Sequence, residues 1–368
     1  MTGIHRISLT LMCSALTTVA LSAGCSDSGK SNKWSTRGQS IVPTTTDPGG
    51  LVLSKKAPAQ IPVQNVDLKN AAIDVLKQAS VSEDPLQRAN AIEGLQPTTE
   101  PLREAVLRGL VDPNEGVRFV ATLSIGTNNL CGISHLVNPL LDDPSGSVRA
   151  AAICTLSLCG KEVDLNPLAG FIFGDNATER ANAALVLAEL GNPSAIPLIR
   201  NGMGRDFKAY DPSRSRTIDL LMAESVVQLG DRTELEAIRA AMFAPPEHSE
   251  LTALACQMLA RLGDQVAAPN MLDLASGDGP RQAGPELRLV AAASLAELAP
   301  DQVPVEMVLE YLSAEDPGVR IQVANALKGL SDPRFEPQLA ILLRDQDPYV
   351  QIATAAAILK MGQGQVAR

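Results

Sequence analysis

From about residue 67 to the end of the chain, apolar residues follow a helical period. In the stretch "SVRAAAICTLSL", Val148, Ala151, Ala152 and Leu156 share one face of a helix. Such apolar stretches are roughly a dozen residues long, and turn-forming residues separate them. The pattern predicts a succession of short amphipathic helices.

These helices belong to a repeat. Arg88, Arg118, Arg149 and Arg180 follow one another at intervals of 30, 31 and 31 residues, each in a related sequence such as "DPNEGVRFVATLSIG". A fixed period of this length is typical of stacked units, because one helix pair cannot bury its apolar face alone. The sequence therefore predicts an all-α fold, an α-solenoid, rather than a single compact core.

Each unit contains signals for the two ends of its second helix. An aspartate is expected to cap the free N–H groups, and the proline after it fits the first turn because no donor is needed there. A glycine at the other end supplies a left-handed cap, and the glycines expected in this role are Gly160, Gly191, Gly230 and Gly263. About nine such helix pairs occur between Asp67 and Met361.

The aspartates and arginines of the repeat are predicted to be structural. They recur too regularly to form one active site, and we interpret them as caps and as a ladder of Asp–Arg pairs between adjacent turns. Such pairs are worth about 0–1 kcal/mol each where they are exposed. The positions are Asp84, Arg88, Asp112, Arg118, Asp143, Arg149, Asp316 and Arg320.

The repeated Asp-Pro, Val-Arg and Ala pattern resembles HEAT-like repeats of the short bacterial type, first associated with phycobilisome lyases. The resemblance covers roughly four fifths of the chain. It implies an α-solenoid of antiparallel helix pairs whose concave face is lined by the second helices. It also implies that another protein binds there.

Composition agrees with a helical protein that binds no nucleic acid. Aromatic residues make up 3% of the chain, and their scarcity disfavours a sheet protein. The formal net charge is −10, so the chain lacks the basic face that phosphates require and is not attracted to anionic lipid. An acidic surface favours a basic protein or peptide as the partner, bound less tightly as salt rises.

The N-terminus has the features of an export signal. Arg6 precedes the uncharged stretch "ISLTLMCSALTTVALSAG", which is typical of a signal peptide. The residues "LSAG" before Cys25 resemble a lipobox, with Ser22 in place of the usual apolar residue. The resemblance implies cleavage before Cys25 and a lipid anchor on it, which would hold the protein to the membrane of a bacterial cell envelope, on the periplasmic face or the outer membrane. Secretion in soluble form is the alternative.

The chain is therefore divided into a signal peptide at 1–24, a flexible tether at 25–66, the solenoid at 67–362 and a C-terminal tail at 363–368. The stretch "GCSDSGKS" at the first boundary also fits the phosphate-binding pattern G-x-x-x-x-G-K-S. That loop needs a strand before it and a helix after it, whereas here an export signal precedes it and Ser, Thr, Pro and Gly follow. We expect no nucleotide to bind.

No catalytic or metal-binding motif stands out, and neither enzymatic activity nor a cofactor is expected. His135 and His248 lack metal-ligand spacing. Deoxyhypusine hydroxylase, an enzyme with such repeats, holds di-iron through His-Glu pairs, and the resemblance does not extend to them because Ser249 follows His248. A maturation factor or enzyme of the bilin-lyase type stays an alternative, as does a purely structural spacer in the envelope.

Four cysteines fall within the predicted solenoid. Cys131 and Cys159 are expected at helix ends that antiparallel packing brings together, so an oxidising compartment would allow a disulfide between them. We favour the alternative, in which these two residues, like Cys154 and Cys256, are small buried thiols.

Two irregular stretches interrupt the repeat, at residues 202–217 and 276–286. The first, "GMGRDFKAYDPSRSRT", gathers basic and aromatic residues of the kind favoured at interfaces, and its alternative interpretation is a long solvated loop. The candidate partner-binding residues are Arg205, Phe207, Lys208, Tyr210, Arg214 and Arg216. The second, "SGDGPRQAGPE", is interpreted as a flexible insertion. The sequence thus favours a non-enzymatic, lipid-anchored scaffold that binds a protein.

Overall fold

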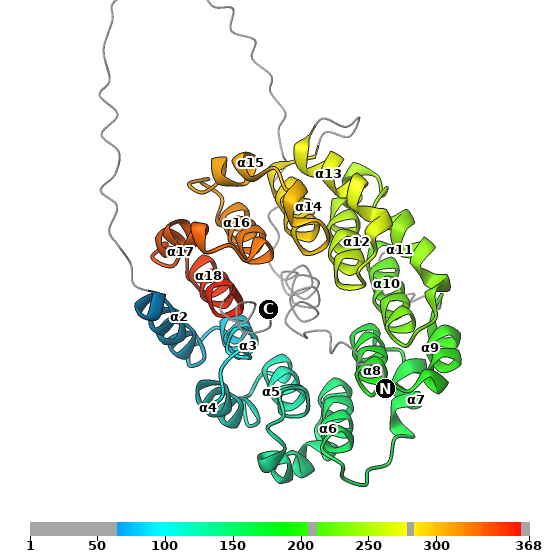
Figure 1. The fold of residues 1–368 in the computed structure, drawn as a ribbon. Coiled ribbons are helices and arrows are strands. Elements are labelled where there is room, and N and C mark those ends of the chain that lie inside the picture. Colours follow the sequence, from blue (N-terminus) through cyan, green and yellow to red (C-terminus); the bar gives the residue numbers. More distant parts are fainter. Residues whose placement is uncertain (1–64, 205–211, 278–282, 362–368) are drawn as a thin grey trace, which may run out of the picture.

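The computed structural model describes residues 65–204, 212–277 and 283–361. Their helices form a ring of two concentric layers, and each outer helix is followed along the chain by an inner one (Figure 1). Nine helix pairs are present in these ranges, which confirms the prediction of an all-α solenoid. Within the same ranges, no helix combines the length and the apolar character needed to cross a membrane.

The outer layer contains the first helix of each pair, and one of these, η2, is a 3₁₀ helix. The outer helices are α2 (Asn65–Ala79), α4 (Glu100–Gly109), η2 (Cys131–Asp142), α7 (Pro167–Phe173), α9 (Ile196–Gly202), α11 (Leu235–Ala241), α13 (Ala268–Ser276), α15 (Val305–Glu310) and α17 (Glu336–Leu342).

The inner layer contains the second helix of each pair, as the resemblance to HEAT-like repeats implies. The inner helices are α3 (Pro85–Gly94), α5 (Glu115–Thr127), α6 (Gly146–Leu158), α8 (Ala177–Glu189), α10 (Pro212–Gln228), α12 (Ser249–Arg261), α14 (Pro285–Leu298), α16 (Pro317–Leu330) and α18 (Pro348–Met361). Short 3₁₀ turns occur at η3 (Pro193–Ala195), η4 (Arg232–Glu234), η5 (Pro246–His248), η6 (Gln265–Ala267), η7 (Pro300–Gln302) and η8 (Pro333–Phe335).

The glycines expected after the inner helices adopt the left-handed conformation. Gly160, Gly191, Gly230 and Gly263 have φ values of 71°, 68°, 105° and 67°. A residue with a side chain is strained in this region of backbone space, which is why glycine ends these helices. This prediction is confirmed.

The expected aspartate caps are present at only some helices. Asp84 caps α3 and Asp316 caps α16. The prediction is wrong for Asp112 and Asp143, because α5 and α6 begin later and have Asn114 and Ser145 as N-caps. The repeat arginine lies four residues after the cap in all four units, so the Asp-Pro dipeptide occurs at two different positions of the repeat.

Small residues let neighbouring helices pack closely throughout the ring. Ala121, Ala151 and Ala291 on inner helices are fully buried. Where α14 meets α16, a Cβ added to Gly329 would stand only 2.7 Å from the Cβ of Ala296. Such contacts exclude larger side chains, and they produce one apolar core that continues from pair to pair.

The ring is closed because α18 packs against α2 and α3 (Figure 1). We call this junction between the last helix pair and the first the seam. Tyr349 at the start of α18 donates a hydrogen bond to the carboxylate of Asp84. A Cβ added to Gly94 in α3 would lie 3.2 Å from the Cβ of Ala356 in α18. The seam is therefore packed as closely as the junctions inside the array.

Candidate binding surfaces

Three of the repeat arginines join consecutive pairs at the face of the ring where the inner helices begin. In each bridge the guanidinium Nε and Nη2 donate to both oxygens of an aspartate that lies two residues before the next inner cap. The bridges are Arg88–Asp112, Arg118–Asp143 and Arg320–Asp345, with N–O distances of 2.7 to 2.9 Å. Nη1 of each arginine also donates to two backbone carbonyls at the start of its own unit.

These bridges are largely shielded from water. In the Arg118–Asp143 bridge the arginine side chain is 15% exposed and the aspartate side chain 5%. The hydrogen bonds from Arg320 lower the pKa of the Asp345 carboxyl. Both oxygens of each aspartate are occupied, so these positions are structural and hold the pairs in register.

Arg149 departs from the ladder. It donates to the carbonyls of Asp143 and Pro144, and its guanidinium carbon lies 5.1 Å from the centre of the Phe171 ring. The position where an acid would accept from it, two residues before the Asn176 cap, is Gly174. A cation–π contact therefore replaces the bridge at this junction.

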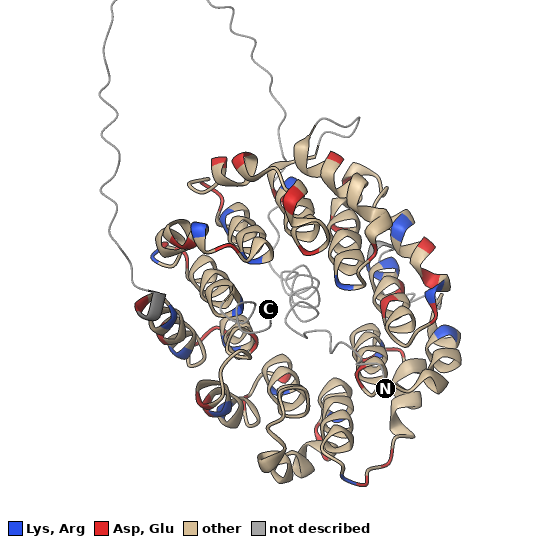
Figure 2. Ribbon diagram, viewed as in Figure 1, with Lys and Arg blue, Asp and Glu red and all other residues tan. Residues whose placement is uncertain are grey.

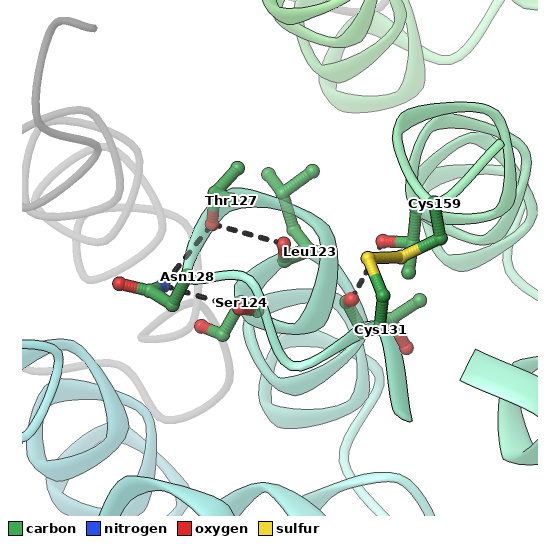
Figure 3. Close-up of a disulfide and its surroundings, with 8 residues drawn as sticks. Leu123, Ser124, Thr127, Asn128, Cys131 and Cys159 are labelled. Carbon is green, nitrogen blue, oxygen red and sulfur yellow. Dashed lines mark hydrogen bonds between the residues drawn. A yellow bond between two sulfur atoms is a disulfide. The ribbon is translucent and has the colours of Figure 1, made fainter. Parts of the chain in front are cut away.

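Cys131 and Cys159 form a disulfide, with their Cα atoms 5.3 Å apart (Figure 3). The favoured expectation of two separate thiols is wrong here, because antiparallel packing brings the start of η2 beside the end of α6. Cys154 and Cys256 are buried thiols outside this disulfide, as expected. Burial raises the pKa of the Cys154 thiol, which therefore stays protonated and is a poor nucleophile.

At the opposite face, where the inner helices end, a set of charged residues of both signs forms what we call the charged rim. Figure 2 shows basic and acidic positions interspersed around the whole ring. The charged rim consists of Glu93, Glu189, Arg261, Glu297, Lys328 and Lys360. Burial, together with the nearby charge of Lys360, lowers the pKa of Lys328 to about 8, although Glu297 and Glu93 act in the opposite direction. Burial also raises the pKa of Glu189 to about 7.

Two members of the charged rim are compensated locally, Arg261 by a buried glutamate outside the rim and Glu93 by its own burial. Arg261 donates to both oxygens of the buried Glu224 at 2.8 and 3.0 Å. Glu93 is buried, and burial raises the pKa of its carboxyl well above the usual range, which favours the neutral acid. The charged rim contains three acidic and three basic residues, so it has no single sign of charge that would select an anion or a cation.

An apolar hollow of about 310 Å³ lies where α10, α11 and α12 meet. Small side chains from α11 and the segment after it leave this space open, while Phe243 at its edge is 57% exposed. The hollow is lined by Met203, Arg216, Asp219, Leu220, Ala223, Ala237, Ala240, Ala241, Phe243, Ala244, Pro245 and Leu251. A mainly apolar cavity with a few charged groups is the usual form of a binding site.

Two residues of the 202–217 stretch, Met203 and Arg216, line the hollow. Arg216 is exposed and lines the hollow, and Arg214 lies two residues earlier on α10. The other candidate residues lie outside the described part of the chain, and they are Arg205, Phe207, Lys208 and Tyr210. Sequence reasoning missed Phe243 and the alanines of α11, whose spacing matches that of buried core alanines elsewhere.

No metal centre is evident in the part of the chain that the structure describes, where no three His, Cys, Asp or Glu side chains could hold an ion together. His248 Nδ1 lies 3.7 Å from Glu250 Oε1. His135 lies on η2, in the outer layer. One exposed His-Glu pair does not provide the repeated ligand sets of a di-iron site.

Comparison with known proteins gives a family for one part of the chain. Residues 281–360 match the family model described as HEAT repeats. None of the curated proteins matches the chain. Among solved structures, the CpcE–CpcF complex of phycocyanin lyase from a Nostoc species is 17% identical, with a TM-score of 0.39, and covers 77% of this chain and 100% of that one. Human deoxyhypusine hydroxylase is also 17% identical, with a TM-score of 0.32. The match covers 80% of this chain and 98% of the hydroxylase chain.

Neither solved structure carries an argument about activity, because identity and TM-score are both low. The family match and the helix pairs together support a coarser statement. Residues 281–360 have the sequence of HEAT repeats, the described ranges fold as an all-α solenoid of helix pairs, and HEAT repeats generally bind other proteins.

Proposed function

We propose that this protein is a non-enzymatic scaffold, anchored by a lipid on Cys25 in a bacterial cell envelope, that binds another protein at the hollow. The observation that carries the proposal is the position of the hollow beside the basic and aromatic stretch of the sequence. Two independent features, one from composition and one from packing, thus indicate the same part of the ring.

The size and lining of the hollow define what it accepts. A volume of about 310 Å³ is at the small end of ligand sites, so it suits one or two apolar side chains rather than a large cofactor. Phe243 and Arg216 at its edge belong to the residue types that contribute most to protein interfaces. A partner would insert an apolar side chain against the alanines of α11 and cover the Phe243 ring.

The net charge of the protein indicates the charge of the partner. With a net charge of −10, the protein attracts a basic partner over distances of roughly one Debye length, about 8–10 Å at physiological salt. Association should therefore slow as salt rises, whereas the apolar contact in the hollow should change little. A partner that is basic overall and carries an exposed apolar side chain satisfies both conditions.

Site-specific photo-crosslinking in cells tests the contact. A photoreactive residue at Phe243 is expected to give one dominant adduct with another protein. The matched control is Ile341 on α17, which is 61% exposed and remote from the hollow. Ala240→Trp, which fills the hollow, should remove the adduct from position 243. Equal adducts at both positions, or an adduct that persists with Ala240→Trp, would contradict the proposal.

The anchor is tested separately, by growing cells with a radioactive fatty acid. Wild-type protein should take up label and sediment with membranes, and Cys25→Ala should do neither. Label retained by the variant would show that the lipid is attached elsewhere or that the lipobox assignment is wrong.

A further inference from the structure

The seam differs from every other junction of the ring in one respect. At the other junctions the chain itself passes from one helix pair to the next, whereas the last pair meets the first through non-covalent contacts alone. The apolar part of the seam includes Leu76, which is fully buried, and the close approach of Gly94 to Ala356. The hydrogen bond from Tyr349 to Asp84 is its polar link.

The seam also lacks the ionic bridge, as do the α6–α8 junction, where Gly174 stands at the aspartate position, and the α14–α16 junction, where Ala314 does. In a bridge, the arginine four residues after one cap reaches the aspartate two residues before the next cap. Counting from the cap Asp347, the arginine position of the last unit is Gln351, and counting from the cap Asp84, the aspartate position of the first unit is Ser82. Gln351 still donates to the carbonyl of Asp345 in its own unit, as the arginines do. The hydrogen bond to a carbonyl of the same unit is thus retained, and the ionic bridge to the next unit is absent.

From these features we infer that the seam is a separable self-interface: the ring opens between α18 and α2–α3, and the freed face of α18 binds α2–α3 of a second copy of this chain. The contacts of α18 with α2 and α3 are the same whether these helices belong to one chain or to two. Within one chain the two faces have a high effective concentration, so the closed ring is the ground state. Between chains, exchange of identical faces is the geometry of domain swapping.

Separation is expected at the seam rather than elsewhere because of chain connectivity. In a repeat array each unit is stabilised by its neighbours, and a terminal unit has only one covalent neighbour. If another junction parts, the connecting chain keeps its two faces together, and they re-form before a second copy can compete. At the seam, the two freed faces belong to opposite ends of the solenoid.

Engineered cysteines on the full-length chain test this inference. A chain carrying both Gly94→Cys and Ala356→Cys should form an internal disulfide once the seam widens by a few tenths of an ångström, because the two Cβ atoms would lie 3.2 Å apart and a disulfide needs about 3.5–4.5 Å. The Leu76 methyl groups, 2.8 and 3.1 Å from the new Cβ at position 94, must rotate away. Failure to form this link would contradict the closed seam itself. The control pair is Ala296→Cys with Gly329→Cys, across the α14–α16 junction. The Cβ atoms there would lie 2.7 Å apart, so the substitutions crowd this junction more than the seam and the control favours opening at α14–α16.

The decisive step mixes two chains that carry one engineered cysteine each. Gly94→Cys and Ala356→Cys chains should give a 94–356 linked dimer, identified by mass spectrometry of the joined peptides. Its yield should exceed by about tenfold that of the control mixture of Ala296→Cys and Gly329→Cys chains. Equal yields, or no linked dimer from the first mixture, would overturn the inference. Tyr349→Phe, which removes the polar link, should raise the rate of dimer formation about fivefold.

Amide hydrogen exchange on the unmodified chain gives a second readout that needs no variant. If the seam separates, amides of α18 and α2 should exchange faster than amides of α14, which has covalent neighbours on both sides. The oxidised Gly94→Cys/Ala356→Cys chain should lose this difference. Uniform protection in α2, α14 and α18 of the unmodified chain would contradict a separable seam.

Discussion

At the scale of single residues, the arginine–aspartate bridges determine how consecutive helix pairs are held. The Arg118 guanidinium occupies both oxygens of Asp143 and also donates to two carbonyls of its own unit. Loss of the arginine would leave a nearly buried carboxylate without its partner. Such a loss is far more costly than that of an exposed ion pair.

We therefore expect Arg118→Ala to lower the free energy of unfolding by about 2–4 kcal/mol, because Asp143 would keep its burial and lose its charge partner. Urea denaturation followed by circular dichroism measures the change. The control is Arg103→Ala, since Arg103 is 46% exposed and its nearest acid, Glu100, is 3.8 Å away. A similar loss in both variants would show that the ladder is not special.

The bridge between Arg320 and Asp345 makes a pH-dependent contribution. Hydrogen bonds from Arg320 hold the pKa of Asp345 below its ordinary value of 3.8. A carboxyl with a depressed folded-state pKa stabilises the fold above pH 3.8, and that stability is lost as pH falls through the folded-state pKa. The wild type should thus be more stable than Asp345→Asn at pH 6, and the difference should shrink below pH 3.8. A difference that is constant with pH would contradict the assignment.

At the scale of helices, much of the architecture follows from local sequence signals, and its limits have physical causes. The helix pairs and their glycine ends are predictable because period and backbone sterics are local. The starts of α5 and α6 are not, because Asp112-Pro113 resembles Asp84-Pro85 and yet serves a bridge rather than a cap. The hollow escapes prediction because alanines around a cavity have the same spacing as alanines in a core, and only the packing of α10, α11 and α12 distinguishes them.

The disulfide between η2 and α6 gives a prediction at this scale. Peptide mapping of unfolded protein without reductant should label Cys154 and Cys256 and leave Cys131 and Cys159 unlabelled. Replacing both bonded cysteines by serine should lower stability by about 2–4 kcal/mol, the usual range for a bridge that closes a loop of this size. Labelling of all four positions would show that the bond does not form in the native protein.

At the scale of the whole molecule, closure of the ring gives the two terminal helix pairs a neighbour on each side. Arrays of this kind usually need end units with a polar outer surface to stay soluble. Here α18 and α2 cover each other instead. Closure cannot be predicted from the repeats, because it depends on small rotations between successive pairs that no single unit encodes.

Completing the ladder across the seam should strengthen the closed form. Ser82→Asp with Gln351→Arg places both halves of a bridge at the two equivalent positions, and we expect a gain of about 1–3 kcal/mol in the free energy of unfolding. Each single change should leave the free energy of unfolding nearly unchanged or lower it, since the new charged residue would lack its partner. A double-mutant cycle in urea measures the coupling, and additive effects of the two changes would argue against a bridge at this place.

The closed circle also determines how the length of the chain can change. An open array can gain or lose a repeat by duplication or deletion, since each remaining unit still finds a neighbour. In the ring of nine pairs formed by the described ranges, α18 meets α2, so removing or adding a pair would keep the ring closed only if the rotations between the other pairs changed as well. Closure thus disfavours a change in the number of repeats and favours differences in length in the connections between helices.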